Sequence, residues 1–556
     1  MKQCCTCVAL MVVIICAAEL QLLYNSATVP AAWKLTSDQV DLSETLRLTI
    51  GLYRNNAKKM DSIFWDVSTP THRRYGEHLD NEAMRRLISP GPDALATVLQ
   101  WIRSYGIEDV TVGRHEDSIK VVATLKQIEQ LLGVHFRQYA HAASGRRLAR
   151  AVDAVHVPTA IAKLVEVVGG HSGFPANTRN GFKPRAEHVM SAQTNVTPAV
   201  LYAAYNATEF PQAPAGQRTL QSFFQYQEYV NQTDLNIFCE EYLKNTPFKT
   251  NISAKCKIAF SVGNNTNLNP GSNVETALDS QYLLSASALS DTWVYSLNNI
   301  DFCGDLMHWA QDVFDEAPSG VFPHVISMSY GVQQTPNYCL GPDVQRLARD
   351  VQKMGTMGIS VIISSGDDGS GESNNVLAPS FPASIPYCTA VGATTFVAGN
   401  SGEQMATTQF GSGGGFSYDY AIPSYQQSFI NDFFAVSNAS LLPPAASYNG
   451  SGRGTPDIAL LGENYNVIYQ LQDTSQMGTS CSTPAFSGFV TLLNNIRLIL
   501  NPLLYSNVAA FQDITLGNND VEEDGYGFYC TTGWDPVTGL GTPNIGKLID
   551  IVKALP

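Results

Sequence analysis

The sequence has no Cys-x-x-Cys motif outside its first twenty residues, which leaves a zinc-binding or thioredoxin-like protein without support. Basic residues are also few: 34 Lys and Arg stand against 49 Asp and Glu, giving a net charge of −15. Because nothing resembling a basic stripe is present to neutralise phosphates, nucleic acid is excluded as the main partner. Long apolar runs are missing everywhere except near the N-terminus, so we expect the mature protein to be soluble.

The single apolar run covers residues 8–18 and follows one lysine, Lys2. It is short for a membrane span and ends in small residues before Glu19, a pattern typical of a secretory signal peptide cleaved after Ala18. An uncleaved anchor is the alternative. The whole chain has 556 residues, of which 44% are hydrophobic, and is long enough for two or three folding units.

Asparagine sequons and cysteines point to the secretory pathway. Seven Asn-x-Ser/Thr sequons, together with a signal peptide, favour a glycosylated luminal or secreted product. The sequons begin at Asn195, Asn206, Asn231, Asn251, Asn264, Asn438 and Asn449. In an oxidising compartment Cys239 can pair with Cys256, and Cys303 with Cys339. Seven cysteines lie outside the signal region, so at least one thiol is unpaired, and Cys481 is our candidate.

The chain divides into two main parts after the signal peptide of residues 1–18. Residues 33–170 contain amphipathic helical segments around the strand-like SIKVVATL, which indicates an α+β domain. The polar stretch at 172–190 is typical of a protease-accessible linker. From residue 198 onward, apolar runs such as HVISMSYG and ISVIISSGDDG alternate with helical segments, which predicts a parallel sheet covered by helices.

The motif GTSCSTP places Ser480 at the start of an apolar helical segment. Small residues allow such a helix start to be buried tightly, and its amide donors and dipole lie beside any negative charge that develops there. Ser480 is therefore a candidate nucleophile; an ordinary helix cap is the alternative interpretation.

A histidine base for this serine is missing from the part of the chain where it is needed. Eight of the ten histidines precede residue 190, and only His308 and His324 remain. His308 lies in a helical segment and His324 opens an apolar strand, settings more typical of structural histidines. A peptidase of the subtilisin type that uses either of them as its base is one alternative.

Carboxylates are the other candidates. Glu275 and Asp279 are four residues apart, so on a helix they lie on one face and can share a proton. The segment that follows is small and apolar, which suggests a buried helix. Asp367 follows a predicted strand in a Gly-rich loop, at the sheet edge where parallel sheets carry their functional crevice.

GTSCSTP, the ETALD segment and SSGDD, in this order of Glu, Asp, Asp and Ser, resemble the motifs of the sedolisin family of serine-carboxyl peptidases. The resemblance covers nearly the whole chain from about residue 40. It implies a subtilisin-like α/β fold with Ser480 as nucleophile and Glu275 as its general base. Asp279 would then orient Glu275 and share its proton, and Asp367 would be the oxyanion donor. A carboxylate can accept the serine proton at acid pH, where histidine is already protonated.

The resemblance also implies one calcium ion near the C-terminus. Its ligands would be the side chains or carbonyls of Asp513, Ile514, Thr531, Gly533 and Asp535, since hard oxygen ligands suit calcium. No organic cofactor is implied.

We therefore expect a zymogen: residues 1–18 a signal peptide, 19–190 an activation propeptide domain that inhibits intramolecularly, and 191–556 the peptidase domain with its calcium loop. The substrate would be peptide or unfolded protein, cut in an acidic lysosome-like compartment or outside the cell. Tripeptide release from free N-termini and internal cleavage are both open, and a noncatalytic binding relative is the alternative class. Because eight histidines precede residue 190, we also expect acid to weaken the propeptide's grip and to trigger processing at about 175–195, below a pH of about 6.

Overall fold

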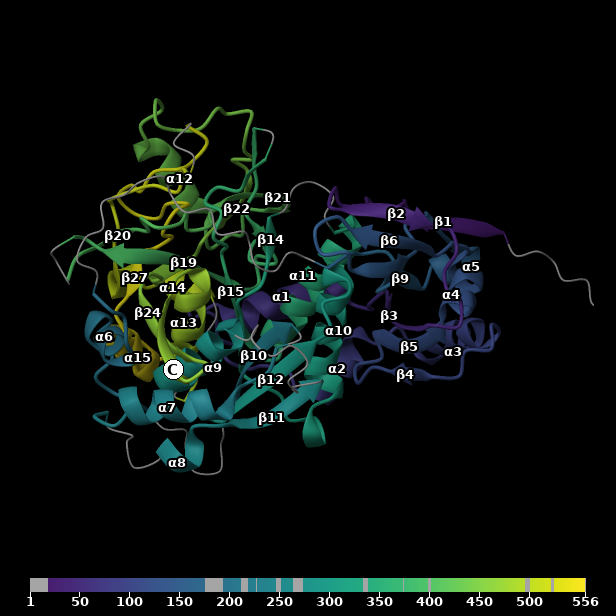
Figure 1. Ribbon diagram of the computed structural model, residues 1–556, viewed down its shortest axis with the longest axis horizontal. Coiled ribbons are helices and arrows are strands. Elements are labelled where there is room, and N and C mark those ends of the chain that lie inside the picture. The colour runs from purple at the N-terminus through teal and green to yellow at the C-terminus, as the bar shows by residue number, and fades with distance from the viewer. Residues whose placement is uncertain are drawn as a thin grey trace, which may run out of the picture.

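The computed structural model describes residues 19–175, 194–211, 219–226, 228–246, 252–263, 274–333, 339–373, 375–398, 402–495, 501–521 and 525–555. The predicted signal peptide, most of the linker and two sequons, Asn251 and Asn264, lie outside these residues. Two bodies are visible in Figure 1: a smaller one built from the N-terminal residues, in purple and blue, and a larger one that contains the rest. Following the expectation from the sequence, we refer to them as the prodomain and the catalytic domain.

The prodomain is an α+β domain around a four-stranded antiparallel sheet of order β4-β5-β3-β9. Amphipathic segments form its helices, and α4 begins with a reciprocal capping box in which Thr124 and Gln127 bond each other's backbone amides. The elements are β1 (Leu20–Tyr24), β2 (Trp33–Ser37), β3 (Thr45–Leu52), α1 (Ala57–Ser68), α2 (Asn81–Ile88), α3 (Pro92–Arg103), β4 (Val110–Val112), β5 (Ser118–Thr124), α4 (Leu125–Leu132), β6 (Arg137–His141), β7 (Arg147–Arg150), β8 (Val155–Pro158), α5 (Thr159–Ala162) and β9 (Val165–Gly169).

The catalytic domain is built on a parallel sheet of order β11-β12-β10-β13-β15-β19-β23, with β20 antiparallel to β19. The sheet strands are β10 (Gln221–Tyr226), β11 (Ile258–Gly263), β12 (Thr292–Leu297), β13 (Val325–Met328), β15 (Ser360–Ser364), β19 (Thr389–Phe396), β20 (Gln404–Ala406) and β23 (Ile458–Leu461). Their central members are buried along their whole length, as expected of a sheet covered on both faces. The predicted α/β fold with a preceding α+β domain is confirmed.

Helices cover both faces of this sheet. On one face α9 (Val274–Ala286) and α13 (Thr479–Asn494) pack together, and on the other lie α10 (Phe302–Asp315) and α11 (Gly341–Thr356) (Figure 1). The remaining helices are α6 (Pro198–Ala204), α7 (Gln232–Tyr242), α8 (Ile252–Lys255), α12 (Gln427–Val436), α14 (Asn501–Tyr505) and α15 (Ile545–Ala554). No helix among the described residues is long and apolar enough to cross a membrane.

Short strands form ribbons around the sheet. They are β14 (Val332–Gln333), β16 (Glu372–Ser373), β17 (Val376–Leu377), β18 (Ser380–Phe381), β21 (Gly415–Ala421), β22 (Gly452–Thr455), β24 (Tyr465–Tyr469), β25 (Gln472–Gln476), β26 (Phe511–Gln512) and β27 (Thr542–Pro543). Both disulfides that the sequence allowed are present, Cys239–Cys256 and Cys303–Cys339. Cys481 is buried and not disulfide-bonded, as predicted.

The prodomain docks on the α10–α11 face through a shared apolar core. Met60 of α1 and Met84 of α2 belong to the same buried cluster as Trp309 of α10 and Leu347 of α11. Burying such side chains stabilises the contact by about 1.5–3 kcal/mol each. The interface is thus continuous with the core of the enzyme.

Glycines make a second part of this interface very close. A Cβ on Gly169 would lie 2.0 Å from the Cε of Met307, and one on Gly304 would lie 2.8 Å from the Cα of Gly170. Gly170 also has a φ of +104°, which residues with a side chain rarely adopt. The end of β9 therefore lies directly on the first turn of α10, with no space for any added carbon.

Buried charges form the third part of the interface, which we call the interface charge cluster. Its residues are Arg54, Asp117 and Glu166 of the prodomain and Arg346, Arg349, Asp350 and Lys353 of α11. The Arg346 guanidinium reaches both Asp117 and Glu166, each at 3.2 Å, and its side chain is 3% exposed. Burying charge is tolerated only when each group is paired, and here the pairs cross the domain boundary.

Candidate active site

Four chain segments meet at the carboxyl edge of the parallel sheet. Ser329 directly follows β13, and Asp367 follows the neighbouring strand β15. Helix α13 begins at Thr479 beside this edge, and α9 packs against α13. A Cβ on Gly488 of α13 would lie 2.6 Å from the Cβ of Ala286 of α9, so small residues let the two helices approach.

Helix α9 holds the predicted acid pair, with Glu275 half-buried in its first turn and Asp279 one turn later. Asp279 is fully buried, and its Oδ1 accepts a hydrogen bond of 2.6 Å from the hydroxyl of Ser329. Its Oδ2 has no hydrogen-bond partner among the described residues. Burial and then the nearby charge of Glu275 raise the pKa of Asp279 well above its usual range. The raised pKa favours the protonated form of Asp279, and the charge of Glu275 contributes to the shift.

Ser480 lies in the first turn of α13, partly exposed at the site. Its hydroxyl lies 3.5 Å from the carbonyl oxygen of Ser329. Ser329 thus contacts both the acid pair, through its own hydroxyl, and the candidate nucleophile, through its backbone.

Asp367 is held by the residue that precedes Ser480. Its Oδ1 accepts hydrogen bonds from the backbone N–H of Thr479 at 2.7 Å and from the Thr479 hydroxyl at 2.8 Å. Burial raises the pKa of Asp367, and the two bonds from Thr479 partly oppose the rise. Asp367 can therefore remain protonated at a pH where an exposed aspartate is ionised, which is the state that donates a hydrogen bond.

The thiol of Cys481 lies close enough to the carboxylates to respond to them. Burial and then the charges of Glu275, Asp367 and Asp279 raise its pKa well above the usual value. A neutral buried thiol is a poor nucleophile, so Cys481 acts as a small apolar residue beneath the serine. The four residues that the sequence singled out are thus brought to one place.

Glu228 is a further acid at this site that the sequence alone did not reveal. It follows β10, and its Oε2 accepts hydrogen bonds from the backbone N–H of Thr276 at 3.0 Å and from the Thr276 hydroxyl at 2.7 Å. A carboxylate that accepts hydrogen bonds from the first turn of α9 is stabilised by the positive end of the helix dipole. Its charge also contributes to the raised pKa of Asp279.

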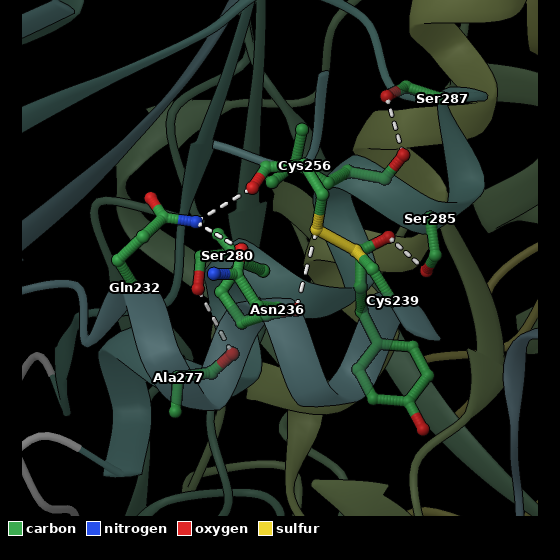
Figure 2. The surroundings of a disulfide bond; sticks show 11 residues. Gln232, Asn236, Cys239, Cys256, Ala277, Ser280, Ser285 and Ser287 are labelled. Carbon is green, nitrogen blue, oxygen red and sulfur yellow. Dashed lines mark hydrogen bonds between the residues drawn. A yellow bond between two sulfur atoms is a disulfide. The ribbon is translucent and has the colours of Figure 1, made fainter. Parts of the chain in front are cut away.

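A disulfide supports α9 from the side away from the sheet. Figure 2 shows Cys239 of α7 bonded to Cys256, with Ala277, Ser280 and Ser285 of α9 close by. Gln232 Nε2 reinforces the link by donating to the carbonyl of Cys256 at 2.7 Å (Figure 2). The cross-link fixes α7, which packs against the helix that carries the acid pair.

The two histidines that the sequence offered as alternative bases, His308 and His324, lie away from Ser480. His308 of α10 is buried at the prodomain interface, where a Cβ on Gly170 would be 3.4 Å from its ring. Burial, and then the charges of Arg47 and Lys120, lower its pKa well below the usual value. His324 precedes β13, at the opposite end of that strand from Ser329. This geometry excludes His308 and His324 as the base for Ser480.

The predicted calcium ligands gather around one turn near the C-terminus. Asp513 Oδ2 accepts from the backbone N–H of Gly533 at 2.9 Å, and Asp535 Oδ2 accepts from that of Thr531 at 3.0 Å. Burial raises the pKa of Asp535 to about 7. Within the described residues neither aspartate has an ion-pair partner, and no group of three His, Cys, Asp or Glu side chains could hold a metal ion. A cation here would need carbonyl oxygens besides the two carboxylates, such as that of Ile514.

The fold and the site define a serine peptidase of the subtilase type with an activation domain, and comparison with known proteins agrees. Residues 32–174 match the family described as "Pro-kumamolisin, activation domain", and residues 304–503 match the subtilase family. A solved structure of Pseudomonas sedolisin, a serine-carboxyl proteinase complexed with two molecules of pseudo-iodotyrostatin, superposes with a TM-score of 0.52 at 21% identity. It covers 65% of this chain and 99% of the sedolisin chain.

Sequence relatives extend this likeness over nearly the whole chain. Tripeptidyl-peptidase 1 of Rattus norvegicus is 32% identical over 550 residues, which are 94% of this chain and 93% of the relative. The Homo sapiens protein of the same name is 31% identical over 549 residues, 94% of each chain. The chain belongs to the sedolisin family of serine-carboxyl peptidases, and the prediction of that family is confirmed.

Proposed function

We propose that the protein is an acid-active peptidase that removes tripeptides from free N-termini through an acyl-enzyme on Ser480. The observation that carries this proposal is the convergence of Ser480 with three carboxyl groups at a sheet edge that no histidine reaches among the described residues. Glu275 would take the serine proton, Asp279 would hold Glu275 and share its proton, and Asp367 would donate to the oxyanion.

The direction of the pKa shifts supports an acid pH optimum. Asp367 has to be protonated to donate a hydrogen bond, and burial raises its pKa, so its proton is lost only as the pH rises through that raised value. A glutamate with a reference pKa of about 4.3 can still accept a proton in mild acid. Both requirements are met together on the acid side of neutrality.

Tripeptide release is supported by relatives that are named tripeptidyl-peptidase 1 and align with 94% of this chain. We expect the acid-activated protein to convert a peptide with a free N-terminus into successive tripeptides, and to leave its N-acetylated copy intact. Mass spectrometry of both digests, run side by side, checks this. Equal cleavage of the two peptides at internal bonds would instead identify an acid endopeptidase of the same fold.

We propose that the chain is made as a zymogen in the secretory pathway and works in an acidic, lysosome-like compartment or outside the cell. The docked prodomain supports an intramolecular inhibitor, and the two disulfides support an oxidising site of folding. In the sequons of Asn231 and Asn438, the asparagine side chain accepts from the backbone N–H two residues later, which leaves a compact exposed or half-buried turn for a glycan.

We also propose that one calcium ion binds between Asp513 and Asp535. The buried carboxylate of Asp535 lacks a cationic partner among the described residues, and oxygen ligands suit calcium. At a concentration of 100 times Kd, an ion that binds only the folded state adds about 2.7 kcal/mol, which corresponds to a rise in Tm of about 5–10 °C.

Removal of calcium tests this proposal. Thermal unfolding with excess EGTA is expected to show the lower Tm, and added Ca²⁺, but not Mg²⁺, is expected to restore it. In Asp513→Asn the calcium-dependent part of the shift should disappear. A Tm that is identical with chelator and with calcium would contradict the proposal.

A further inference from the structure

Thr479, the residue before Ser480, makes several hydrogen bonds to Asp367 and its loop. It is fully buried, and its N–H and hydroxyl both donate to the same oxygen, Oδ1 of Asp367. Its hydroxyl oxygen in turn accepts from the backbone N–H of Gly366 at 3.2 Å. One residue therefore binds the Asp367 side chain twice and the Asp367 loop once.

Two donors on one carboxyl oxygen decide where the acid proton can be. A carboxylic acid carries its proton on one oxygen and accepts hydrogen bonds best on the other. Because Oδ1 of Asp367 already accepts from both groups of Thr479, a proton on Oδ1 would face two donors. The proton of the neutral acid is therefore confined to Oδ2.

The backbone around Oδ2 is kept clear of side chains. Gly478 has a φ of +129°, and a Cβ built there would lie 2.8 Å from Oδ2 of Asp367. Any other residue at this position would place a carbon against that oxygen. The room around Oδ2 thus depends on a glycine at position 478, as the orientation of the carboxyl depends on Thr479.

We propose that Thr479 is a positioning residue that fixes Oδ1 of Asp367 as acceptor and so presents Oδ2 as the hydrogen-bond donor to the oxyanion. This inference rests on the proposed function, in which Asp367 donates to the oxyanion of a Ser480 acyl-enzyme. Thr479 itself contacts neither the substrate nor the reacting atoms. It acts by preventing rotation of the Asp367 carboxyl group and by fixing which of its oxygens carries the proton. Both would otherwise have to be restricted in the transition state.

Thr479→Val tests the inference because it removes the hydroxyl and keeps the backbone donor. We expect kcat to fall about 10- to 100-fold with little change in KM, less than the roughly 100- to 1,000-fold cost of losing an oxyanion donor outright. The hydroxyl bond from Thr479 favours the ionised form of Asp367, so its loss should move the alkaline limb of the kcat–pH profile to higher pH. Thr479→Ser keeps both donors. Its kcat should stay within about threefold of the parent value, and the alkaline limb of its kcat–pH profile should stay at the parent pH.

A matched control separates positioning from loss of stability. Thr491 is buried in the same helix, and its hydroxyl donates within the core, away from Asp367. Thr491→Val should lower Tm without moving the alkaline limb. Should Thr479→Val fail to fold, Thr479→Ala removes the same hydroxyl without a β-branched side chain, and the same limb is measured.

Asp367→Asn provides a second test of how Thr479 orients the side chain at position 367. With Thr479 present, the asparagine oxygen should face Thr479 and its NH₂ the oxyanion, so the variant should keep part of its activity and lose the alkaline limb. Adding Thr479→Val should lower kcat about 10-fold further, because the amide can then flip.

The outcomes separate the inference from the function on which it rests. If Asp367→Ala retains full activity, the proposed role of Asp367 is wrong. If Asp367→Ala loses activity while Thr479→Val keeps kcat and its alkaline limb unchanged, the oxyanion role stands and the positioning role of Thr479 is overturned.

Discussion

Ser480→Ala is expected to lower kcat by about a millionfold, the scale on which loss of the nucleophile acts when several residues work as a unit. The prodomain of this variant should remain uncleaved after incubation at about pH 4, because no acyl-enzyme can form. The physical reason is that the carboxyl groups around Ser480 can move its proton and stabilise its oxyanion, but no other described hydroxyl occupies that position. Hydrolysis of a peptide and the mass of the full-length chain are the two measurements.

The control for this variant lies two residues away in the same motif. Ser482 is buried, and its hydroxyl donates to the backbone carbonyl of Thr479 at 2.9 Å. Ser482→Ala should keep most of its activity. Undiminished hydrolysis by Ser480→Ala would show that another residue is the nucleophile. A parent protein that hydrolyses no peptide between pH 3 and 7 would instead favour the noncatalytic binding relative.

Asp117→Asn is expected to loosen the docked prodomain at neutral pH. Burial alone would raise the pKa of Asp117, but Lys353, Arg54 and Arg346 together lower it well below its usual range. The amide would leave these three cations without their shared partner. Breaking a buried ion pair in this way costs about 3–5 kcal/mol, or a roughly 100- to 4,000-fold weaker contact.

Acid should weaken the same contact in the parent protein. The lowered pKa values of the buried histidines and the lowered pKa of Asp117 both predict that docking is lost as the pH falls. Burial lowers the pKa of His115 to about 3 and that of His308 well below its usual value. Undocking returns such a histidine to a pKa of about 6.5, so the undocked state binds more protons and docking is lost as the pH falls below that value. The lowered pKa of Asp117 adds a loss that begins only below a pH of about 4.

Hydrogen exchange of the α11 amides, measured in the full-length Ser480→Ala chain, checks both statements. Protection should decrease as the pH falls from 7 to 3.5 once the intrinsic pH dependence of exchange is removed, and at pH 7 it should already be low in Asp117→Asn. Asp38→Asn is the matched control, because Asp38 is 80% exposed and lies 3.6 Å from Arg137 within the prodomain. Protection that does not change with pH or with Asp117→Asn would contradict a docking contact made by buried charge.

The sequence predicted those elements whose pattern is local. NEAMRRLI forms α2, DVQRLARDVQKMG lies within α11, and the first seven residues of SIKVVATL form β5, because helical and strand periodicities are decided by neighbours in the chain. The four acidic and serine side chains of the site were also found, since each stands in a short motif.

Contacts between distant segments could not be predicted in the same way. Ser329 follows an ordinary apolar strand, and only the placement of α9 at the carboxyl end of β13 brings it to Asp279. Glu228 reaches α9 by a loop whose course no local pattern indicates. The number of histidines in the prodomain suggested that acid weakens its contact, but not which of them are buried: burial lowers the pKa of His115 to about 3 and that of His171 to about 4. Burial of this kind is a property of the docked pair of domains.

The glycine contact between the end of β9 and α10 restricts how the two domains can diverge. One methyl group added at Gly169 or Gly304 would overlap atoms of the other domain. Adding a side chain at Gly304 therefore requires a compensating change in the backbone across the interface, whereas at Gly169 the flexible end of the Met307 side chain has to move. The prodomain and the enzyme it covers are consequently expected to change as a matched pair during evolution, and a prodomain taken from a distant relative should bind this catalytic domain poorly even if its own fold is intact.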